Sequence, residues 1–454
     1  MFLTKRLGFV VLGALVTAGC GGNTASLPNG PIEPAVRTAG TGSASPIQHV
    51  VLAIQENRTF NDFFATYPGA DGTTTGAVEK SSACKISKNK TIALTESALE
   101  VTKNLAYNYA NYATARDSGK MDGFDLAYFP GGTPECTYPY QYTDPSQIEP
   151  YWDIAKQYVL AEHMFTTQGS ASFTAHQDLI RGSTTLPSGL ALVDYPNHDP
   201  WGCDAPKGTV TSLITADDQL EKPGTGPFPC FTYETLRDLL DAKGVSWKYY
   251  TPSITEAGMW WNAYDAIKAV RYGSEWTNNV ISPQTDILSD ISNGALPAMS
   301  WLIPDADDSD HPGNTSDTGP SWIASVVNAI GQSKYWDSTV LIIVWDDWGG
   351  LYDNLNPKQY PYGGLGFRVP ALIVSAYAKQ NYISQTDYEF GSILKYVEQN
   401  WDLGSLGTSD KRATSIIDCF DYSQKPRKFV TIPSKYSKEY FLRRPPSGLP
   451  VDTF

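Results

Sequence analysis

Short apolar segments alternate with amphipathic segments along most of the chain. Runs of apolar and β-branched residues predict strands over 48–54, 245–250, 297–303, 338–345 and 368–375. Apolar residues at helical spacing predict helices over 232–243, 321–333 and 388–401. Strands that are apolar along their whole length and alternate with helices are typical of a parallel sheet covered on both faces. We therefore predict an α/β fold in which helices flank a largely parallel central sheet.

Polar side chains directly follow three of these predicted strands. Glu56 and Asn57 follow the first, Asp305 follows the strand at 297–303, and Asp346 and Asp347 follow the strand at 338–345. In open α/β sheets the ligand binds at the carboxyl ends of the strands. Carboxylates gathered there repel one another unless a cation lies among them, and such oxygen ligands suit a divalent metal. Acidic residues that only cap helices after strands are the structural alternative.

The first twenty residues have the pattern of an export signal. Basic residues precede the apolar run 7–16, and small residues at 17–19 stand before Cys20. A cysteine directly after Ala-Gly resembles the lipobox of bacterial lipoproteins, in which this cysteine is lipidated. We therefore predict a signal peptide over 1–19, a lipid anchor on Cys20 and a protein exported to the periplasm or the cell surface. An ordinary signal peptide with an incidental cysteine is the alternative.

Composition defines the segments on either side of the main domain. Residues 20–46 are rich in Gly, Pro, Ser and Thr and lack periodicity, which is typical of a flexible tether. All the predicted strands and helices fall within 47–425, which we take as the catalytic domain. Residues 426–454 contain repeated prolines and lack helical periodicity, so we expect an extended segment that wraps the domain.

Charge and composition exclude two classes of protein. The 454-residue chain has 34 basic and 48 acidic residues, hence a net charge of −14, which argues against nucleic acid as a partner. Aromatic residues make up 12% and charged residues only 18%, the opposite of a disordered composition. Beyond the N-terminus no apolar run has the ~18 residues that a membrane-spanning helix requires.

Export would place the cysteines where disulfides persist. Apart from Cys20, the chain contains Cys84, Cys136, Cys203, Cys230 and Cys419. We predict that Cys203 pairs with Cys230, since they bracket one loop-like stretch, and that Cys84 pairs with Cys136, which leaves Cys419 as a buried thiol. Spacing alone does not fix the connectivity.

Sequence blocks in a fixed order resemble the bacterial phosphoesterase family that contains phospholipases C and acid phosphatases of the A type. The blocks are IQHVVLAIQENRTFNDFFATYPGADG (47–72), GKMDGF (119–124), LPAMSWLIPDADDSDHP (296–312) and STVLIIVWDDWGGLYDN (338–354). The resemblance covers about residues 47 to 425 and implies a sandwich like that of alkaline phosphatase. It implies that Glu56 and Asn57, with Asp346 and Asp347, contact the metal.

The family's nucleophile is a Ser or Thr in a short turn, and QGSASFTAHQDLIRG (168–182) is the corresponding stretch. Ser172 aligns best and would also contact the metal, but the prolines of the family turn are missing, so Ser170 and Thr174 remain alternatives. A hydroxyl at the start of a helix meets the helix dipole, which favours a bound phosphate. His176 lies one helical turn later, where it shares the catalytic face or bonds to the backbone instead.

The resemblance also assigns acid–base and substrate-binding roles. His311 corresponds to a histidine that touches the phosphate or protonates the leaving group, a role suited to its pKa near neutrality. We expect Asn57, Asp305 and Tyr107 to bind substrate. Tyr107 stands where the family commonly has histidine, and Asn354 likewise. With 5 histidines in the whole chain, we expect one divalent metal ion held by oxygens, of unknown identity, rather than a histidine-rich pair of zinc ions.

These observations predict an exported, metal-dependent phosphoesterase. It would hydrolyse phosphomonoesters or phosphodiesters, as an acid phosphatase or a phospholipase C does, through a phosphoserine intermediate. The expected partners are a phosphate ester, as a small molecule or a lipid head group, and the membrane through the lipid anchor. One alternative is a binding protein on the same fold that holds a phosphorylated lipid or glycan without turnover. A sulfatase is the other, but the Cys/Ser-x-Pro-x-Arg motif does not occur.

Overall fold

The computed structural model describes residues 45–100 and 103–447. The predicted signal peptide, Cys20 and the tether up to residue 44 lie outside the described residues. Within them, no helix combines the length and the apolar character needed to cross a bilayer.

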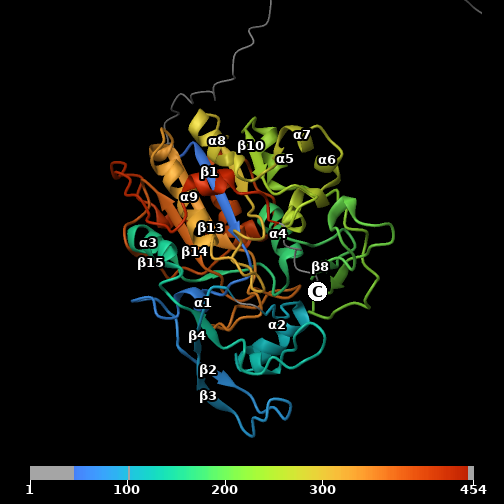
Figure 1. The fold of residues 1–454 in the computed structure, drawn as a ribbon. Helices are drawn as coiled ribbons and strands as arrows, with labels where there is room; N and C mark the ends of the chain where they lie inside the picture. Colours follow the sequence, from blue (N-terminus) through green and yellow to red (C-terminus); the bar gives the residue numbers. More distant parts are fainter. Residues whose placement is uncertain (1–44, 101–102, 448–454) are drawn as a thin grey trace, which may run out of the picture. The chain divides into compact units, whose positions relative to one another are not determined.

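An eight-stranded sheet forms the centre of the domain, in the order β11-β10-β12-β1-β13-β14-β6-β15 (Figure 1). Its strands are β1 (His49–Gln55), β6 (Val159–Ala161), β10 (Trp247–Tyr250), β11 (Val280–Ile281), β12 (Met299–Leu302), β13 (Thr339–Trp345), β14 (Ala371–Ser375) and β15 (Tyr382–Ser384). All run parallel except β14, which is antiparallel to β13 and β6. The predicted largely parallel sheet is therefore confirmed.

The two central strands are buried along their whole length. Every residue of β1 and β13 is buried, as expected for strands that carry apolar side chains on both faces. β1 lies between β12 and β13, and its last residue, Gln55, is in register with Trp345 at the end of β13. The residues that follow β1 and β13 therefore emerge side by side at one edge of the sheet.

Helices cover both faces of this sheet. In the register of the strands, Trp301 pairs with Leu52 and Trp345 with Gln55. Since alternate residues of a strand point to opposite faces, the two tryptophans lie on opposite faces. Trp301 Nε1 donates to a carbonyl of α4 (Ser172–Arg181), whereas the Trp345 ring packs edge-on against Tyr151 of α3 (Glu149–Gln157). These two helices thus stand on opposite sides of the sheet.

Each side has further helices. α3 packs with α9, and α9 also contacts α8 and α12; on the other side α4 contacts α5 and α10. The remaining bounds are α1 (Phe60–Phe64), α2 (Tyr109–Arg116), α5 (Leu236–Ala242), α6 (Lys268–Arg271), α7 (Glu275–Asn278), α8 (Asp286–Asn293), α9 (Gly319–Gly331), α10 (Phe390–Trp401), α11 (Ser409–Arg412) and α12 (Lys438–Arg443). The helices predicted from apolar spacing correspond to α5, α9 and α10.

Short pairs of strands lie outside the main sheet. They are β2 (Thr75–Val78) with β3 (Lys90–Ala93), β4 (Thr95–Ser97) with β5 (Gln141–Thr143), β7 (Met164–Phe165) with β16 (Tyr388–Glu389), and β8 (Ala191–Val193) with β9 (Ser212–Ile214). Both predicted disulfides, Cys84–Cys136 and Cys203–Cys230, are present, and Cys419 is a buried free thiol. Each disulfide joins two segments that lie outside the main sheet.

Residues 426–447 of the predicted C-terminal segment lie along the domain and differ from the prediction in one respect, whereas residues 448–454 lie outside the described part of the chain. The segment contains the helix α12. The sequence did not predict this helix, because the segment is rich in prolines and the helix buries a single apolar residue, which is too few for a helical pattern. That residue, Phe441, is buried and its ring packs at 5.4 Å from Trp322 of α9. Further along, Asn328 exchanges two hydrogen bonds with the backbone of Ile432.

Candidate active site

Four polar residues come together where β1 and β13 end. The Asp346 N–H donates to the Gln55 carbonyl at 2.9 Å, which continues the pairing of the two strands by one residue. The Asn57 N–H donates to Asp346 Oδ1, also at 2.9 Å. Glu56, Asn57, Asp346 and Asp347 are all completely buried. The predicted acidic pairs therefore meet at the carboxyl edge of the sheet.

The turns after the two strands are closely fitted to each other. Asn57 has φ 59°, a left-handed conformation that few non-glycine residues adopt. Gly349 has φ 58°, and a Cβ atom built on it would lie 2.1 Å from the Asn57 carbonyl oxygen. Its N–H donates to Asp347 Oδ1 at 2.8 Å. Glycine at 349 therefore permits the close approach that orients both Asn57 and Asp347.

Ser172 is the first residue of α4, and its hydroxyl points at the acidic edge. Ser172 Oγ lies 3.0 Å from Asp347 Oδ2 and 3.3 Å from Asn57 Oδ1. The side chain is 1% exposed. At this position the first N–H groups of the helix and its dipole favour negative charge beside the hydroxyl. A carboxylate at this distance can accept the proton of the hydroxyl.

The two alternative nucleophiles have other partners. Ser170 Oγ accepts a hydrogen bond from the Asp194 N–H at 2.7 Å. Thr174 Oγ1 donates to Ser170 Oγ at 2.8 Å and also lies 3.0 Å from the Ala171 carbonyl. These hydroxyls connect the start of α4 to the segment after β8. Of the three candidates, Ser172 is the one whose hydroxyl bonds to Asn57 and Asp347.

His176 contacts two of the carboxylates from one turn further along α4. Its Nε2 lies 2.9 Å from Glu56 Oε1 and 3.7 Å from Asp346 Oδ2. Burial lowers the pKa of His176 to about 4, which keeps the imidazole neutral. Of the two roles that the sequence left open, a place on the face of Ser172 and a bond to the backbone, the structure favours the first, and it shows that His176 faces Glu56 and Asp346.

This group of residues has the donor set of a metal site. Ligand atoms of Glu56, His176 and Asp346 all lie within 4.8 Å of one another. Asp346 Oδ2 is buried yet accepts no hydrogen bond within the described chain. Buried carboxylates facing one another and a neutral imidazole are costly unless a cation lies among them. The residues present therefore fit one divalent cation, with Asn57, Asp347 and Ser172 beside it.

His311 and Tyr107 form a second pair near this edge. Tyr107 Oη lies 3.4 Å from His311 Nε2, and His311 Nδ1 lies 2.5 Å from the Pro312 carbonyl oxygen. Because a carbonyl only accepts hydrogen bonds, Nδ1 carries a proton and Nε2 is the atom left for proton exchange. Trp261 stacks on the imidazole at 5.9 Å and 17°. This stacking was not predicted, because Trp261 and His311 lie far apart in the sequence.

Two hydrogen bonds to backbone carbonyls connect this pair to the acidic edge of the sheet. The Glu56 N–H donates to the Ser309 carbonyl at 2.9 Å, and Ser309 lies two residues before His311. Trp348 Nε1, directly after Asp347, donates to the Tyr107 carbonyl at 3.0 Å. His311 and Tyr107 are thus held by the segments that carry Glu56 and Asp347.

Asp305, predicted to bind substrate, has other partners in the structure. Its Oδ2 lies 2.6 Å from Arg444 of the C-terminal segment, and its Oδ1 accepts the Asp308 N–H at 3.1 Å. Both carboxylate oxygens are engaged, so Asp305 stabilises the turn that leads to His311. The contact with Arg444 was not predicted, because 139 residues separate Arg444 from Asp305.

Asn354, which stands where the family commonly has histidine, contacts an arginine. Arg368 donates to Asn354 Oδ1 at 2.8 Å and, through Nε, to Asp353 Oδ1 at 3.0 Å. Arg368 and Asp353 are fully buried. Asparagine at 354 therefore takes part in a buried ion-pair network.

The GKMDGF block contributes Asp122 to a second acidic group. Oxygens of Glu79, Asp117 and Asp122 lie within 4.8 Å of one another. Lys120 Nζ lies 2.5 Å from Asp117 Oδ2 and so already supplies a positive charge there. This block stabilises the loop between α2 and the 3₁₀ turn at 124–126, and it contributes no residue to the contacts described for Ser172.

A buried hydroxyl at a helix start, facing carboxylates at the edge of a parallel sheet, defines a hydrolase-type site. The phosphoesterase family model matches residues 47–404, and the chain belongs to this family. It is accordingly a hydrolase that acts on phosphate esters, as the sequence blocks predicted.

Bacterial phospholipases C are among its relatives. Phospholipase C A of Mycobacterium tuberculosis is 25% identical over 411 residues, covering 78% of this chain and 73% of the relative. The non-hemolytic phospholipase C of Pseudomonas aeruginosa is 24% identical over 416 residues, covering 79% of this chain and 54% of that protein.

Among solved structures, the chain is similar to a protein in the alkaline phosphatase superfamily from Vibrio parahaemolyticus. The identity is 11%, the TM-score is 0.34, and 72% of this chain and 74% of that chain are covered. The phosphonate monoester hydrolase of Agrobacterium radiobacter has 10% identity and a TM-score of 0.34, with 84% and 79% covered.

Proposed function

We propose that this protein is an exported, metal-dependent phosphoesterase that uses Ser172 as its nucleophile. Among phosphate esters we propose the phosphodiester of a phospholipid as the preferred substrate. The relatives named as phospholipases C support this choice. The observation that carries the proposal is the 3.0 Å contact between Ser172 Oγ and Asp347 Oδ2, beside Glu56, His176 and Asp346.

The metal would be held by Glu56, Asn57, Asp346 and Asp347, with His176 as a further ligand from α4. A divalent ion bound there would lower the pKa of the serine hydroxyl and neutralise charge on the phosphoryl oxygens. The acidic donor set and the single neutral imidazole suit an ion that prefers oxygen ligands, such as Mg²⁺, Ca²⁺ or Mn²⁺.

The protein's own groups carry out the proton transfers. Ser172 Oγ gives its proton to Asp347 Oδ2 and attacks phosphorus, while the bond from phosphorus to the leaving oxygen breaks. His311, protonated on both ring nitrogens at this stage, donates the proton on Nε2 to that leaving oxygen. Water then gives a proton to His311 Nε2 and attacks phosphorus, while the bond from phosphorus to Ser172 Oγ breaks and Asp347 returns its proton to Oγ. The product released is the phosphomonoester, or phosphate from a monoester. Tyr107 and Trp261 fix the orientation of the His311 ring during both steps.

Export and membrane anchoring are part of the proposal. The N-terminal pattern 1–20 supports cleavage before Cys20, lipidation of that cysteine and a location in the periplasm or at the cell surface. The two disulfides support the same conclusion, because disulfides persist in oxidising compartments. A lipid anchor would hold the enzyme at the surface that supplies a phospholipid substrate. Labelling of the full chain with a fatty acid, compared with Cys20→Ser, tests the anchor.

Paired chromogenic substrates test the activity. A phosphomonoester and a phosphodiester with the same leaving group are hydrolysed from pH 5 to 8, with added divalent metals and with chelator. The proposal expects turnover of the diester that chelation abolishes and metal restores. Turnover without metal would contradict the metal-dependent mechanism, and turnover of the monoester alone would reassign the protein as a phosphatase. Tight binding of the ester without turnover would indicate a binding protein. The replacement of the family's histidine by Tyr107 would then be the first explanation to test.

A further inference from the structure

The loop that carries His311 is held by the C-terminal segment. This loop spans residues 303–318 between β12 and α9 and contains Asp305, Asp307, Asp308, Asp310 and Asp317. So many carboxylates in one loop repel one another, and the repulsion favours an open loop unless positive charge compensates it.

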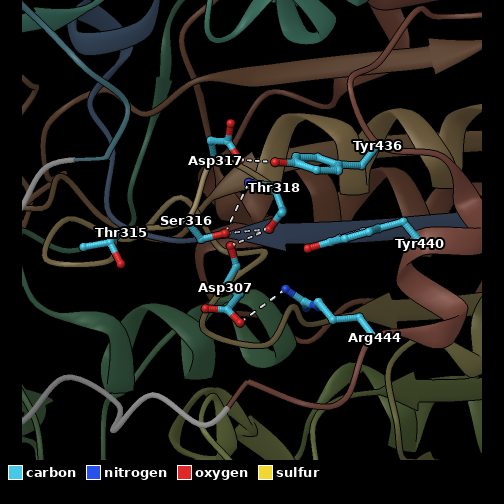
Figure 2. A pocket seen from close by; sticks show the side chains of 8 residues that line it. All are labelled: Asp307, Thr315, Ser316, Asp317, Thr318, Tyr436, Tyr440 and Arg444. Carbon is cyan, nitrogen blue, oxygen red and sulfur yellow. Dashed lines mark hydrogen bonds and ion pairs between the residues drawn. The ribbon is translucent and has the colours of Figure 1, made fainter.

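Arg444, just after α12, supplies that charge. Its Nη2 lies 2.6 Å from Asp305 Oδ2 and 2.7 Å from Asp308 Oδ2, and its Nη1 lies 3.3 Å from Asp307 Oδ2. Figure 2 shows Arg444 and Asp307 facing each other across the pocket between the loop and the C-terminal segment. A planar guanidinium presents several donors in a fixed geometry, which suits the bridging of three carboxylates.

A second contact holds the far end of the same loop. Tyr436 Oη donates to Asp317 Oδ1 at 2.9 Å, and Lys435 Nζ lies 2.5 Å from Asp317 Oδ2. Tyr436 and Tyr440 stack on each other with ring centroids 4.6 Å apart, so residues 435–444 contact the loop as one unit. Figure 2 shows Tyr436 and Tyr440 on the same wall of the pocket as Arg444.

Hydrogen bonds within the loop connect the Arg444 contacts to the active site. The Asp308 carbonyl accepts from Gln55 Nε2 at 2.8 Å, and Gln55 directly precedes Glu56. Ser309 Oγ accepts the His311 N–H at 3.2 Å and donates to the Ala306 carbonyl at 2.7 Å. The turn that places His311 is therefore built on the residues that Arg444 bridges.

Burial makes the loop depend on Arg444. Asp308 is completely buried, and desolvation together with Asp305 raises its pKa, while Arg444 and the Thr318 hydroxyl lower it. Without the guanidinium, two buried carboxylates would face each other with no cation between them. The loop would then take up a proton or open, and either change displaces the turn at 306–309.

We propose that Arg444 is a positioning residue for His311: by bridging Asp305, Asp307 and Asp308 it fixes the turn that sets the imidazole at the leaving oxygen. This inference rests on the proposed role of His311 as the proton donor. It assigns the C-terminal segment to the active site and not only to stability.

The variants Arg444→Gln and Arg444→Lys test this inference, with Arg443→Gln as the matched control because Arg443 is exposed at the end of α12. Two phosphodiesters are compared that differ only in the leaving group, one a nitrophenol and one an alkyl alcohol. A poor leaving group needs the proton, whereas a good one does not. We expect Arg444→Gln to lower kcat for the alkyl ester by about 100-fold and for the nitrophenyl ester by less than about 5-fold.

Several results would overturn the inference. Equal loss of kcat for both esters would give Arg444 a structural role only, and unchanged kcat for both would give it none. If Arg444→Gln does not fold, kcat for the two esters is measured in Arg444→Lys and Asp307→Asn and is interpreted by the same criteria. The His311 ring signals in NMR, assigned with His311→Asn, provide a readout without turnover: they should shift in Arg444→Gln and stay unchanged in Arg443→Gln. This distinguishes the inference from the proposed function, whose failure is the absence of turnover in the unmodified protein.

Discussion

Ser172 Oγ lies 3.0 Å from Asp347 Oδ2, although 175 residues separate the two in the sequence. α4 packs on one face of the sheet and begins at the carboxyl edge. Its first residue, Ser172, therefore meets Asp347, the second residue after β13. The contact gives the serine hydroxyl a proton acceptor, and it places that hydroxyl beside Glu56, Asp346 and His176. The proposed function of the protein depends on this contact.

The identity of the nucleophile is tested by a pair of serine variants. We expect Ser172→Ala to lower kcat by at least about 1,000-fold, since it removes the attacking oxygen. Ser170→Ala should stay within about 10-fold, because its hydroxyl bonds the Asp194 N–H and not the acidic edge. Steady-state hydrolysis of the preferred ester measures both. The reverse order of effects would move the nucleophile to Ser170.

The fit between the two turns is tested at Gly349. In Gly349→Ala the new Cβ would overlap the Asn57 carbonyl, so we expect at least about a 10-fold loss of metal affinity and a loss of more than about 2 kcal/mol in the free energy of unfolding. Gly244→Ala is the matched control, because Gly244 has φ 64° with no atom near its Cβ position. That control should cost about 1 kcal/mol. Equal effects at both positions would show that backbone conformation alone matters.

Local patterns predicted the strands, the main helices and the edge at which the site lies. The apolar runs that became β1 and β13 are buried on both faces, so their sequence carries a strong signal. The sequence also placed Glu56, Asn57, Asp346 and Asp347 together, because parallel neighbouring strands end at the same edge. The direction of β14 was not predictable, since an antiparallel strand inside such a sheet has the same apolar composition.

Contacts between distant segments could not be predicted from the sequence. Arg444 lies in the segment predicted to be extended, and no contact was predicted for it; of its three aspartate partners, Asp305 was predicted to bind substrate. His176 was predicted to share the face of Ser172 or to bond to the backbone, and only the packing of α4 shows that it faces Glu56. These contacts depend on tertiary packing, which residue spacing does not encode.

The stability of the protein should depend on metal. Binding to the folded state alone adds about 2.7 kcal/mol to the free energy of unfolding when the free ion is 100 times its Kd. We therefore expect the thermal midpoint to rise with added divalent ion and to fall with chelator. Asp346→Asn should abolish the rise, whereas Asp122→Asn, in the acidic group that contains Lys120, should retain it. A rise that survives Asp346→Asn but not Asp122→Asn would relocate the metal.

Glu135 gives a prediction for the dependence of stability on pH. Burial raises the pKa of Glu135 from 4.5 to about 8, so the folded protein keeps this carboxyl protonated at pH values where the unfolded chain has lost the proton. Stability from this group is present below pH 4.5 and is lost as the pH rises towards 8, by up to about 4 kcal/mol. Urea unfolding at pH 5 and pH 8 should show a smaller difference for Glu135→Gln than for the unmodified protein. An equal difference would contradict the assignment.

Reduction of the disulfides should destabilise the domain without removing the site. Cys203 and Cys230 are 27 residues apart, and loop-closure entropy gives their bond about 3.5 kcal/mol. We expect the double variant Cys203→Ser with Cys230→Ser to lose about that much free energy of unfolding while keeping its metal affinity. Cys419→Ser serves as the control, because that thiol forms no disulfide. Loss of metal binding in the double variant would show that the 203–230 loop shapes the site.

The proposed mechanism requires that Ser172 carries the phosphoryl group during turnover. Mass spectrometry of the protein, acid-quenched during hydrolysis of the diester in saturating metal, detects this intermediate. We expect the peptide containing Ser172 to gain the mass of one phosphoryl group, chelator to prevent the gain, and Ser172→Ala to abolish it. Active, metal-loaded protein that never gains this mass under slowed turnover, or gains it on another residue, would rule out Ser172 as the nucleophile.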